Sequence, residues 1–154
     1  LIGKDVFYAY AYKGDELNIT GLDKNADNMW KVNAGVVDDG TYGKVVLVTP
    51  KTVTKAGIIM DNKSRKLSFK CGLHEAAKTV SDGAVLKVSI YEAGNKKASY
   101  EKEIVIKPDA DFEKISIDLK EYKDKNIFIV FEGEAGDNQN EDCDWIVIQK
   151  AMID

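Results

Sequence analysis

The sequence predicts an all-β fold, an antiparallel β-sandwich formed by a single domain spanning residues 1–154. The chain has 154 residues, and one domain usually contains about 100 to 200. Apolar and polar residues alternate with a period of two in most segments, which is typical of half-buried strands, and helical periodicity is nearly absent. Turn residues recur about every 8 to 12 residues, so about nine short strands fit the chain.

The first half of the chain contains four predicted strands. In residues 5–12, Val6, Tyr8, Tyr10 and Tyr12 would share one face of the first strand, which is most simply a sheet face. Residues 13–28 are rich in Gly, Asp and Asn and are predicted to form turns. Further strands are expected to begin at Trp30 and to cover residues 45–49 and 57–60.

The second half of the chain alternates most regularly. The segment Lys66–Leu73 places Leu67, Phe69, Cys71 and Leu73 on one face. Further strands are predicted over residues 84–91, 103–107, 112–119, 126–132 and 145–148, the last extending towards 153. This last strand is apolar on both faces, so we expect it in the middle of a sheet. Helix is expected only as one turn over residues 74–78.

Charge and hydropathy exclude two classes of partner. The net charge of −4 comes from 22 basic and 26 acidic residues spread along the chain, so no basic stripe is available for nucleic acid. The longest apolar run covers residues 127–131, far short of the roughly 20 residues of a membrane span, and we expect a soluble domain. The chain begins with Leu1 rather than Met, which suggests a piece of a larger protein.

Three stretches in the last half of the chain resemble a known family. They are residues 67–73 with 82–88, residues 117–125 running into 127–131, and residues 136–145, where Asn140, Asp142 and Asp144-Trp145 form an acidic loop before the final strand. Together they resemble the galactose-binding-like jelly rolls, and within them the novel putative carbohydrate-binding module family. The resemblance implies a non-catalytic carbohydrate-binding module attached to other domains of an extracellular or cell-surface protein. The sequence departs from the pattern at His74 and Glu75, where an Asp is expected.

Candidate ligand-binding residues follow from the order of the strands. Because successive strands are antiparallel, residues 74–81, 108–111 and 133–144 are expected at the same end of the sandwich. His74, Glu75, Asn138 and Asp142 would offer hydrogen bonds to sugar hydroxyls there. We therefore predict a rim for ligand binding at this end.

A sugar site also needs an aromatic face. Trp30 is our candidate for that face, and Tyr42 is a second, because both lie near polar or Gly-rich segments. The tyrosines of the first strand could supply a face as well. Trp145 begins an apolar strand, so we expect it in the core rather than in a platform.

Residues 132–144 are acidic and contain no basic residue. A solvated loop is the simpler interpretation, but carboxylates at this density also suit Ca²⁺. The residues that would bind the cation are Asp137, Asp142 and Asp144. The spacing matches no EF-hand loop.

Catalytic motifs do not emerge from the sequence. His74 is the only histidine, which excludes a two-histidine zinc site, and it is expected in a surface loop. Two alternative functions remain, a structural or adhesion domain that binds protein and a small glycan-active enzyme with a carboxylate pair. Cys71 and Cys143 could both point inward, either as a disulfide or as free thiols.

Overall fold

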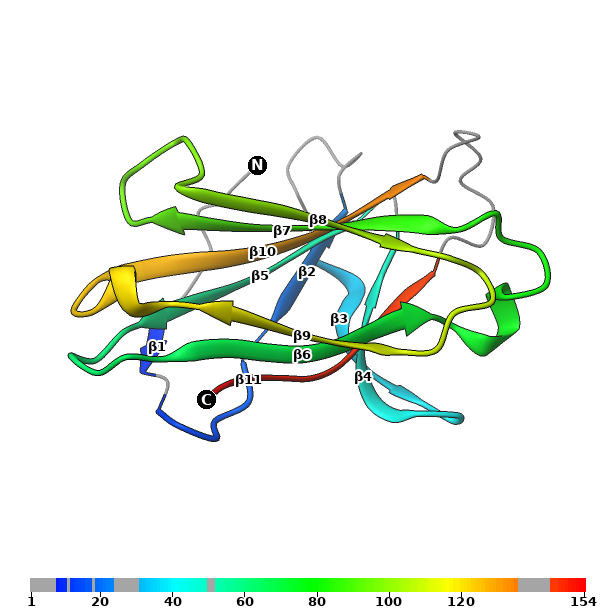
Figure 1. Ribbon diagram of the computed structural model, residues 1–154, viewed down its shortest axis with the longest axis horizontal. Helices are drawn as coiled ribbons and strands as arrows, with labels where there is room; N and C mark the ends of the chain where they lie inside the picture. Colours follow the sequence, from blue (N-terminus) through cyan, green and yellow to red (C-terminus); the bar gives the residue numbers. More distant parts are fainter. Residues whose placement is uncertain (1–7, 11, 18, 24–30, 50–51, 136–144) are drawn as a thin grey trace.

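The predicted all-β sandwich is confirmed by the computed structural model, which describes residues 8–10, 12–17, 19–23, 31–49, 52–135 and 145–154 (Figure 1). This part of the chain holds no helix long and apolar enough to cross a membrane. Its elements are β1 (Tyr8–Tyr10), β2 (Thr20–Asp23), β3 (Lys31–Asp39), β4 (Gly43–Val48), β5 (Thr52–Ile59), β6 (Lys66–Leu73), the 3₁₀ turn η1 (Glu75–Ala77), β7 (Ala84–Glu92), β8 (Tyr100–Ile106), β9 (Glu113–Asp118), the 3₁₀ turn η2 (Lys120–Tyr122), β10 (Asn126–Ala135) and β11 (Ile146–Ile153).

The strands follow one continuous hydrogen-bonded path that folds back into two layers. The path runs β8-β7-β10-β5-β2-β3-β4-β11-β6-β9. In Figure 1, β8, β7, β10 and β5 form one layer, and β11, β6 and β9 lie in the other. The path continues from the first layer to the second through β2, β3 and β4. The pairs along this path are antiparallel, as predicted. The exception lies off the path, where β1 pairs with β5 in parallel at Gly57 to Ile59.

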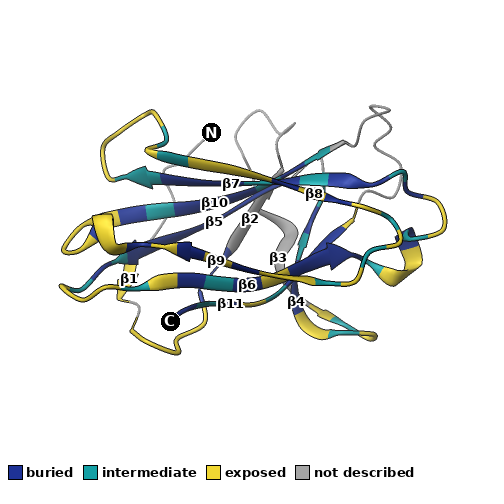
Figure 2. Ribbon diagram, viewed as in Figure 1, coloured by how far each residue is buried: buried dark blue, intermediate teal, exposed yellow. Residues whose placement is uncertain are grey.

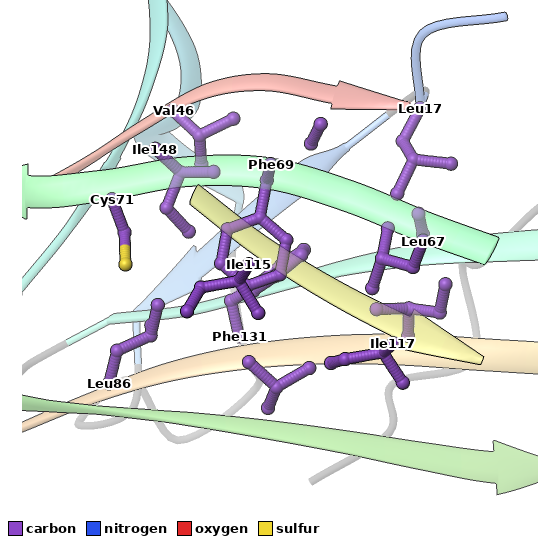
Figure 3. Packing of buried hydrophobic residues seen from close by; sticks show 14 of the residues in the cluster. Leu17, Val46, Leu67, Phe69, Cys71, Leu86, Ile115, Ile117, Phe131 and Ile148 are labelled. Atoms are coloured by element: carbon purple, nitrogen blue, oxygen red, sulfur yellow. The ribbon is translucent and has the colours of Figure 1, made fainter. Parts of the chain in front are cut away.

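The core lies between the two layers (Figures 2 and 3). Phe69 of β6 and Phe131 of β10 face each other edge to face, with ring centroids 5.4 Å apart. Ile115 of β9 packs in the same cluster. Full burial of each such side chain contributes about 1.5–3 kcal/mol, so this contact between layers is a main source of stability.

Strand prediction succeeded where alternation is regular. The segment Lys66–Leu73 is β6 with the predicted bounds. The last strand, β11, lies between β4 and β6 in mid-sheet, as its two apolar faces indicated. The single helical turn after β6 is η1. The predicted first strand, residues 5–12, is β1 at Tyr8–Tyr10, but Tyr12 lies outside the strand, so that prediction was wrong at its end. Residues 5–7, Ala11 and Trp30 lie outside the described residues.

One strand contradicts the sequence prediction. β2 lies within the stretch that we predicted to be turns. Its four residues include Gly21 and Asp23, which disfavour strands in isolation. The strand forms because it pairs with β5 on one side and β3 on the other, so tertiary pairing overrides local propensity.

The cysteine side chain in β6 points into the core, as alternation predicted. Cys71 is 1% exposed and is a free thiol (Figure 3). Burial, followed by the charge of Glu113, raises its pKa to about 12. Cys143 lies outside the described residues.

Residues 74–83 and 107–112 lie at the same end of the sandwich, because β6 and β8 end there and β7 and β9 begin there (Figure 1, right). Gly83 lies against the end of β8: its φ of +107° and the 2.8 Å approach of a Cβ position to the Ile106 carbonyl oxygen both require glycine. We call this end, with Trp145, the His74 end. The opposite end, where β1 and β11 end, is the Tyr10 end. The predicted grouping of these two loops is thus confirmed.

Candidate functional site

His74 follows the last residue of β6 and is fixed at three atoms. Its backbone N–H donates to the carbonyl oxygen of Trp145 (2.9 Å), which continues the pairing of β6 with β11. Its Nδ1 accepts a hydrogen bond from the Ala76 backbone N–H (3.0 Å) and so caps η1. The ring orientation is therefore set by the turn that follows it in the chain.

The third contact joins His74 to Asp39 at the end of β3. Nε2 of His74 lies 2.8 Å from Oδ2 of Asp39. Because Nδ1 accepts from Ala76, the proton of the neutral ring lies on Nε2 and is donated to Asp39. This bond, followed by one from the Thr41 backbone N–H (2.7 Å), lowers the pKa of Asp39 from its usual 3.8. Asp39 is thereby held as a carboxylate.

Tyr42 lies in the tight turn between β3 and β4 and packs onto the same end. Its ring meets the His74 ring edge to face, with centroids 5.2 Å apart, and lies tilted against Phe112 at 5.5 Å. Its hydroxyl oxygen accepts a hydrogen bond from the Glu75 backbone N–H (2.9 Å). The tip of the β3–β4 hairpin is therefore anchored to the end of β6.

Trp145 completes the aromatic group on the other side of His74. Its ring lies edge to face with His74 at a centroid distance of 6.1 Å, and the residue is 40% exposed. The prediction that Trp145 belongs to the core was wrong. The strand begins one residue later, at Ile146, so Trp145 stands at the end of the sandwich instead of between its layers.

The arrangement places ring surfaces beside polar groups. Tyr42, His74, Phe112 and Trp145 form a continuous aromatic cluster, which we call the aromatic rim. Glu75 is exposed next to it. An indole that is partly open to solvent can cover an apolar ring face, and a carboxylate and a tyrosine hydroxyl at the same end of the sandwich can bond hydroxyl groups.

The structure brings together two of the predicted ligand-binding residues, His74 and Glu75. The His74 ring is more buried than a surface loop residue would be, with its side chain 14% exposed, because Asp39 and Tyr42 cover it. Its role is therefore to hold the rim in place. The other predicted ligand-binding and metal-binding residues lie outside the described residues; they are Trp30, Asp137, Asn138, Asp142 and Asp144.

Asp39 is the residue of this site that sequence reasoning missed. It precedes Gly40 and Tyr42 in a tight turn, and its Oδ1 accepts from the Thr41 and Tyr42 backbone N–H groups. A sequence signal for the turn was present, because Asp often bonds backbone amides two residues further on. No local pattern indicated that the turn would reach His74, 35 positions away in the chain.

Asp82 is a second polar feature of the His74 end. Both carboxylate oxygens are buried and lack a hydrogen-bond partner. A buried carboxylate without a donor is costly, so a cation or a donor of a ligand would be stabilised there. The described residues contain no group of three or more potential metal ligands. β10 ends at Ala135, which pairs with Ala84, two residues from Asp82.

Comparison with known proteins identifies the fold. No family model and no curated protein sequence matches the chain. Among solved structures, the CBM51 module from Clostridium perfringens GH95 in complex with methyl-galactose has a TM-score of 0.55 at 12% identity, and the match covers 100% of this chain and 95% of that one. TmCBM61 in complex with β-1,4-galactotriose has a TM-score of 0.50 at 11% identity, covering 77% and 79%.

A third similar structure is the K1 cleaved adhesin domain of Lys-gingipain from Porphyromonas gingivalis, with a TM-score of 0.51, 15% identity, and coverage of 88% and 89%. At these identities the likeness shows a shared fold. The chain therefore shares the β-sandwich fold of these two carbohydrate-binding modules, in agreement with the fold that the sequence resemblance implied.

Proposed function

We propose that this chain is a non-catalytic carbohydrate-binding module that binds glycan at the aromatic rim. The observation that carries the proposal is the exposed Trp145 indole, held edge to face on a His74 ring that is itself fixed by Asp39 and Ala76. An aromatic surface held in one orientation loses little conformational entropy when a sugar covers it. The rim is thus organised before the ligand arrives.

Roles in binding can be assigned to the described residues. Trp145 covers the apolar face of a sugar ring, and the Glu75 carboxylate accepts hydrogen bonds from hydroxyls. The Tyr42 hydroxyl already accepts from the Glu75 backbone, which leaves its proton to be donated to a ligand oxygen. Asp39 and His74 position these groups. Trp30, Asn138 and Asp142 remain the contacts proposed from the sequence.

The choice of sugar is guided by the neighbouring folds. The two similar carbohydrate-binding modules were solved with methyl-galactose and with β-1,4-galactotriose. We therefore propose a galactose-containing glycan as the ligand of the rim. These two sugars are the first probes, with N-acetylglucosamine and glucose as comparison sugars.

The test is a calorimetric titration with both galactosides, repeated with Trp145→Ala and Glu75→Gln. We expect Trp145→Ala to weaken binding about tenfold or more, which corresponds to about 1.4 kcal/mol. Val105→Ala is the matched control, because Val105 is an exposed apolar residue (65%) on β8, which lies at the opposite end of the strand path from β6 and β9. Unchanged affinity in both rim variants, with melting temperatures equal to the parent's, would contradict the proposal.

A bound Ca²⁺ is a separate proposal for the same end. The orphaned carboxylate of Asp82 fits a hard cation, and Asp137, Asp142 and Asp144 follow the end of β10 in the sequence. A thermal melt with and without chelator tests it. We expect added Ca²⁺ to raise the melting temperature of the parent but not of Asp82→Asn, and equal responses of the two proteins would remove Asp82 from the site.

Protein adhesion is the second candidate function, favoured by the likeness to the Lys-gingipain adhesin domain. If no glycan binds at millimolar concentration, adhesion becomes the better proposal. Hydrolysis of the titrated sugar would instead indicate a glycan-active enzyme. In either binding role we propose that the domain acts outside the cell or at its surface, attached to other domains.

A further inference from the structure

Two tyrosines stand exposed at the Tyr10 end of the sandwich, at the far end from the aromatic rim. Tyr10 is 65% exposed and Tyr12 is 53% exposed. β1 pairs with the end of β5, so Tyr10 lies opposite Ile59, whereas His74 follows the end of β6. An eight-residue strand such as β6 is roughly 25 Å long, which separates the two ends by about that distance.

The two tyrosine rings face the same way. Their planes differ by 6° and their centroids lie 6.3 Å apart. At this separation the rings do not bury each other, because both residues keep more than half of their surface exposed. We call these two exposed, nearly parallel rings the tyrosine pair.

The backbone that follows Tyr12 is held by hydrogen bonds. The Tyr12 backbone N–H donates to Oδ2 of Asp15 (2.9 Å), and the Asp15 backbone N–H donates to the Tyr12 carbonyl oxygen (3.0 Å). Gly14 adopts a φ of +88° in this turn, and its N–H donates to the carbonyl oxygen of Ile153 at the end of β11 (2.7 Å). The turn that carries Tyr12 is therefore tied to the sheet.

The surroundings of the tyrosine pair favour a sugar over a protein partner. Among the described residues that follow Tyr12 in the chain, Lys13, Asp15 and Glu16 are exposed, so charged side chains adjoin the two rings. A stable protein interface usually buries about 1,600 Å² around an apolar centre, far more than two rings provide. Sugar rings match this pattern, because each has an apolar face for stacking and hydroxyls that bond charged side chains.

We propose that the tyrosine pair is a second glycan-binding site, which takes two consecutive pyranose rings of an extended β-linked chain, one on each tyrosine. The separation of the ring centroids is comparable with the repeat of sugar residues along such a chain. This site does not depend on the aromatic rim. With sites at both ends, the domain binds two glycan segments at once and gains avidity for polysaccharide over short oligosaccharides.

The experiment titrates soluble β-1,4-galactohexaose and β-1,4-glucohexaose into the protein. Calorimetry measures the number of hexasaccharides bound per protein, and NMR chemical-shift changes show at which end of the sandwich each one binds. The variants are Tyr10→Ala/Tyr12→Ala, Tyr10→Phe/Tyr12→Phe and Trp145→Ala. We expect the double alanine variant to weaken hexasaccharide binding at the Tyr10 end about tenfold. The phenylalanine variant keeps the rings and should bind within about twofold of the parent. Val105→Ala is again the exposed control.

Each outcome separates the two sites. Two sites in the parent, of which Trp145→Ala removes one and the double alanine variant removes the other, support both proposals. One site that is lost only in Trp145→Ala leaves the rim and overturns the tyrosine pair. One site that is lost only in the double alanine variant supports the tyrosine pair and overturns the rim. Absence of binding by the parent to either hexasaccharide overturns the tyrosine pair.

Discussion

Replacing Gly72 by alanine tests how tightly the aromatic rim is packed onto β6. A Cβ at this position would lie 2.6, 2.8 and 2.9 Å from three carbons of the Phe112 ring. Phe112 in turn packs against Tyr42, whose hydroxyl bonds the Glu75 backbone. The Gly72→Ala substitution therefore displaces the Phe112 ring of the aromatic rim, and it replaces no residue that we propose to contact the ligand.

The expected cost follows from these distances. Carbon atoms pack best at about 3.5–4.0 Å, so the Phe112 ring must move by about 1 Å. Overpacking costs about 1–3 kcal/mol, and the low end applies because Phe112 is half-buried and can move towards solvent. Alanine is better than glycine in a strand by about 0.5–1 kcal/mol, which offsets part of the cost. We expect a net loss of about 1 kcal/mol, or about 2–4 °C in Tm for a chain of this size.

The assay is denaturant unfolding of a double-mutant cycle with Phe112→Ala. In the Phe112→Ala background the ring is absent, so Gly72→Ala should be neutral or stabilising. Gly40→Ala is the control, because a Cβ at Gly40 meets no atom within 4 Å. The reasoning is refuted if Gly72→Ala destabilises the protein equally with and without the Phe112 ring.

Three further predictions concern charge, the thiol and the core. The pKa of Asp39 is lowered from 3.8, so its contribution to stability is complete above that value and is lost as pH falls through the lower folded pKa. Asp39→Asn should therefore melt below the parent at pH 7 and approach it as pH falls below 3.8 and through the lowered folded pKa, and a difference that stays constant on acidification would contradict the His74 contact. In a Cys143→Ser variant, Cys71 should resist alkylation at about pH 8 and react once the chain is unfolded, because its thiol is buried with a pKa of about 12. Phe131→Ala should lower the free energy of unfolding by about 3–5 kcal/mol in urea, since the side chain is fully buried between the layers, and a loss under about 1 kcal/mol would contradict that packing.

Local pattern was sufficient to predict most strands. Alternation located β6 to the residue, because its inward side chains contact the core along the whole strand. It failed for β2, where pairing with two neighbours supplies the stability that the residues themselves lack. The parallel pairing of β1 with β5 was also beyond local pattern, because register between distant strands leaves no mark in either segment.

The candidate site was predictable only in part, because contacts between segments that are distant in the sequence leave no local pattern. The end of the sandwich and the position of His74 followed from antiparallel succession. Its partners Asp39 and Tyr42 come from a hairpin about 30 residues earlier, and only the folded backbone brings them to the end of β6. The exposure of Trp145 depended on a strand boundary one residue away, which alternation cannot resolve.

The hydrogen-bonded path among the described strands ends at β8 and β9. Their unpaired edges are where a strand of a second copy could add to the sheet. β8 exposes the charged run from Glu101 to Glu103, and β9 begins with the exposed pair Glu113 and Lys114. A second strand that added to either edge would have to remove these charges from water or oppose like charges. Neighbouring copies at high concentration are therefore expected to resist strand-to-strand aggregation and to remain separate units.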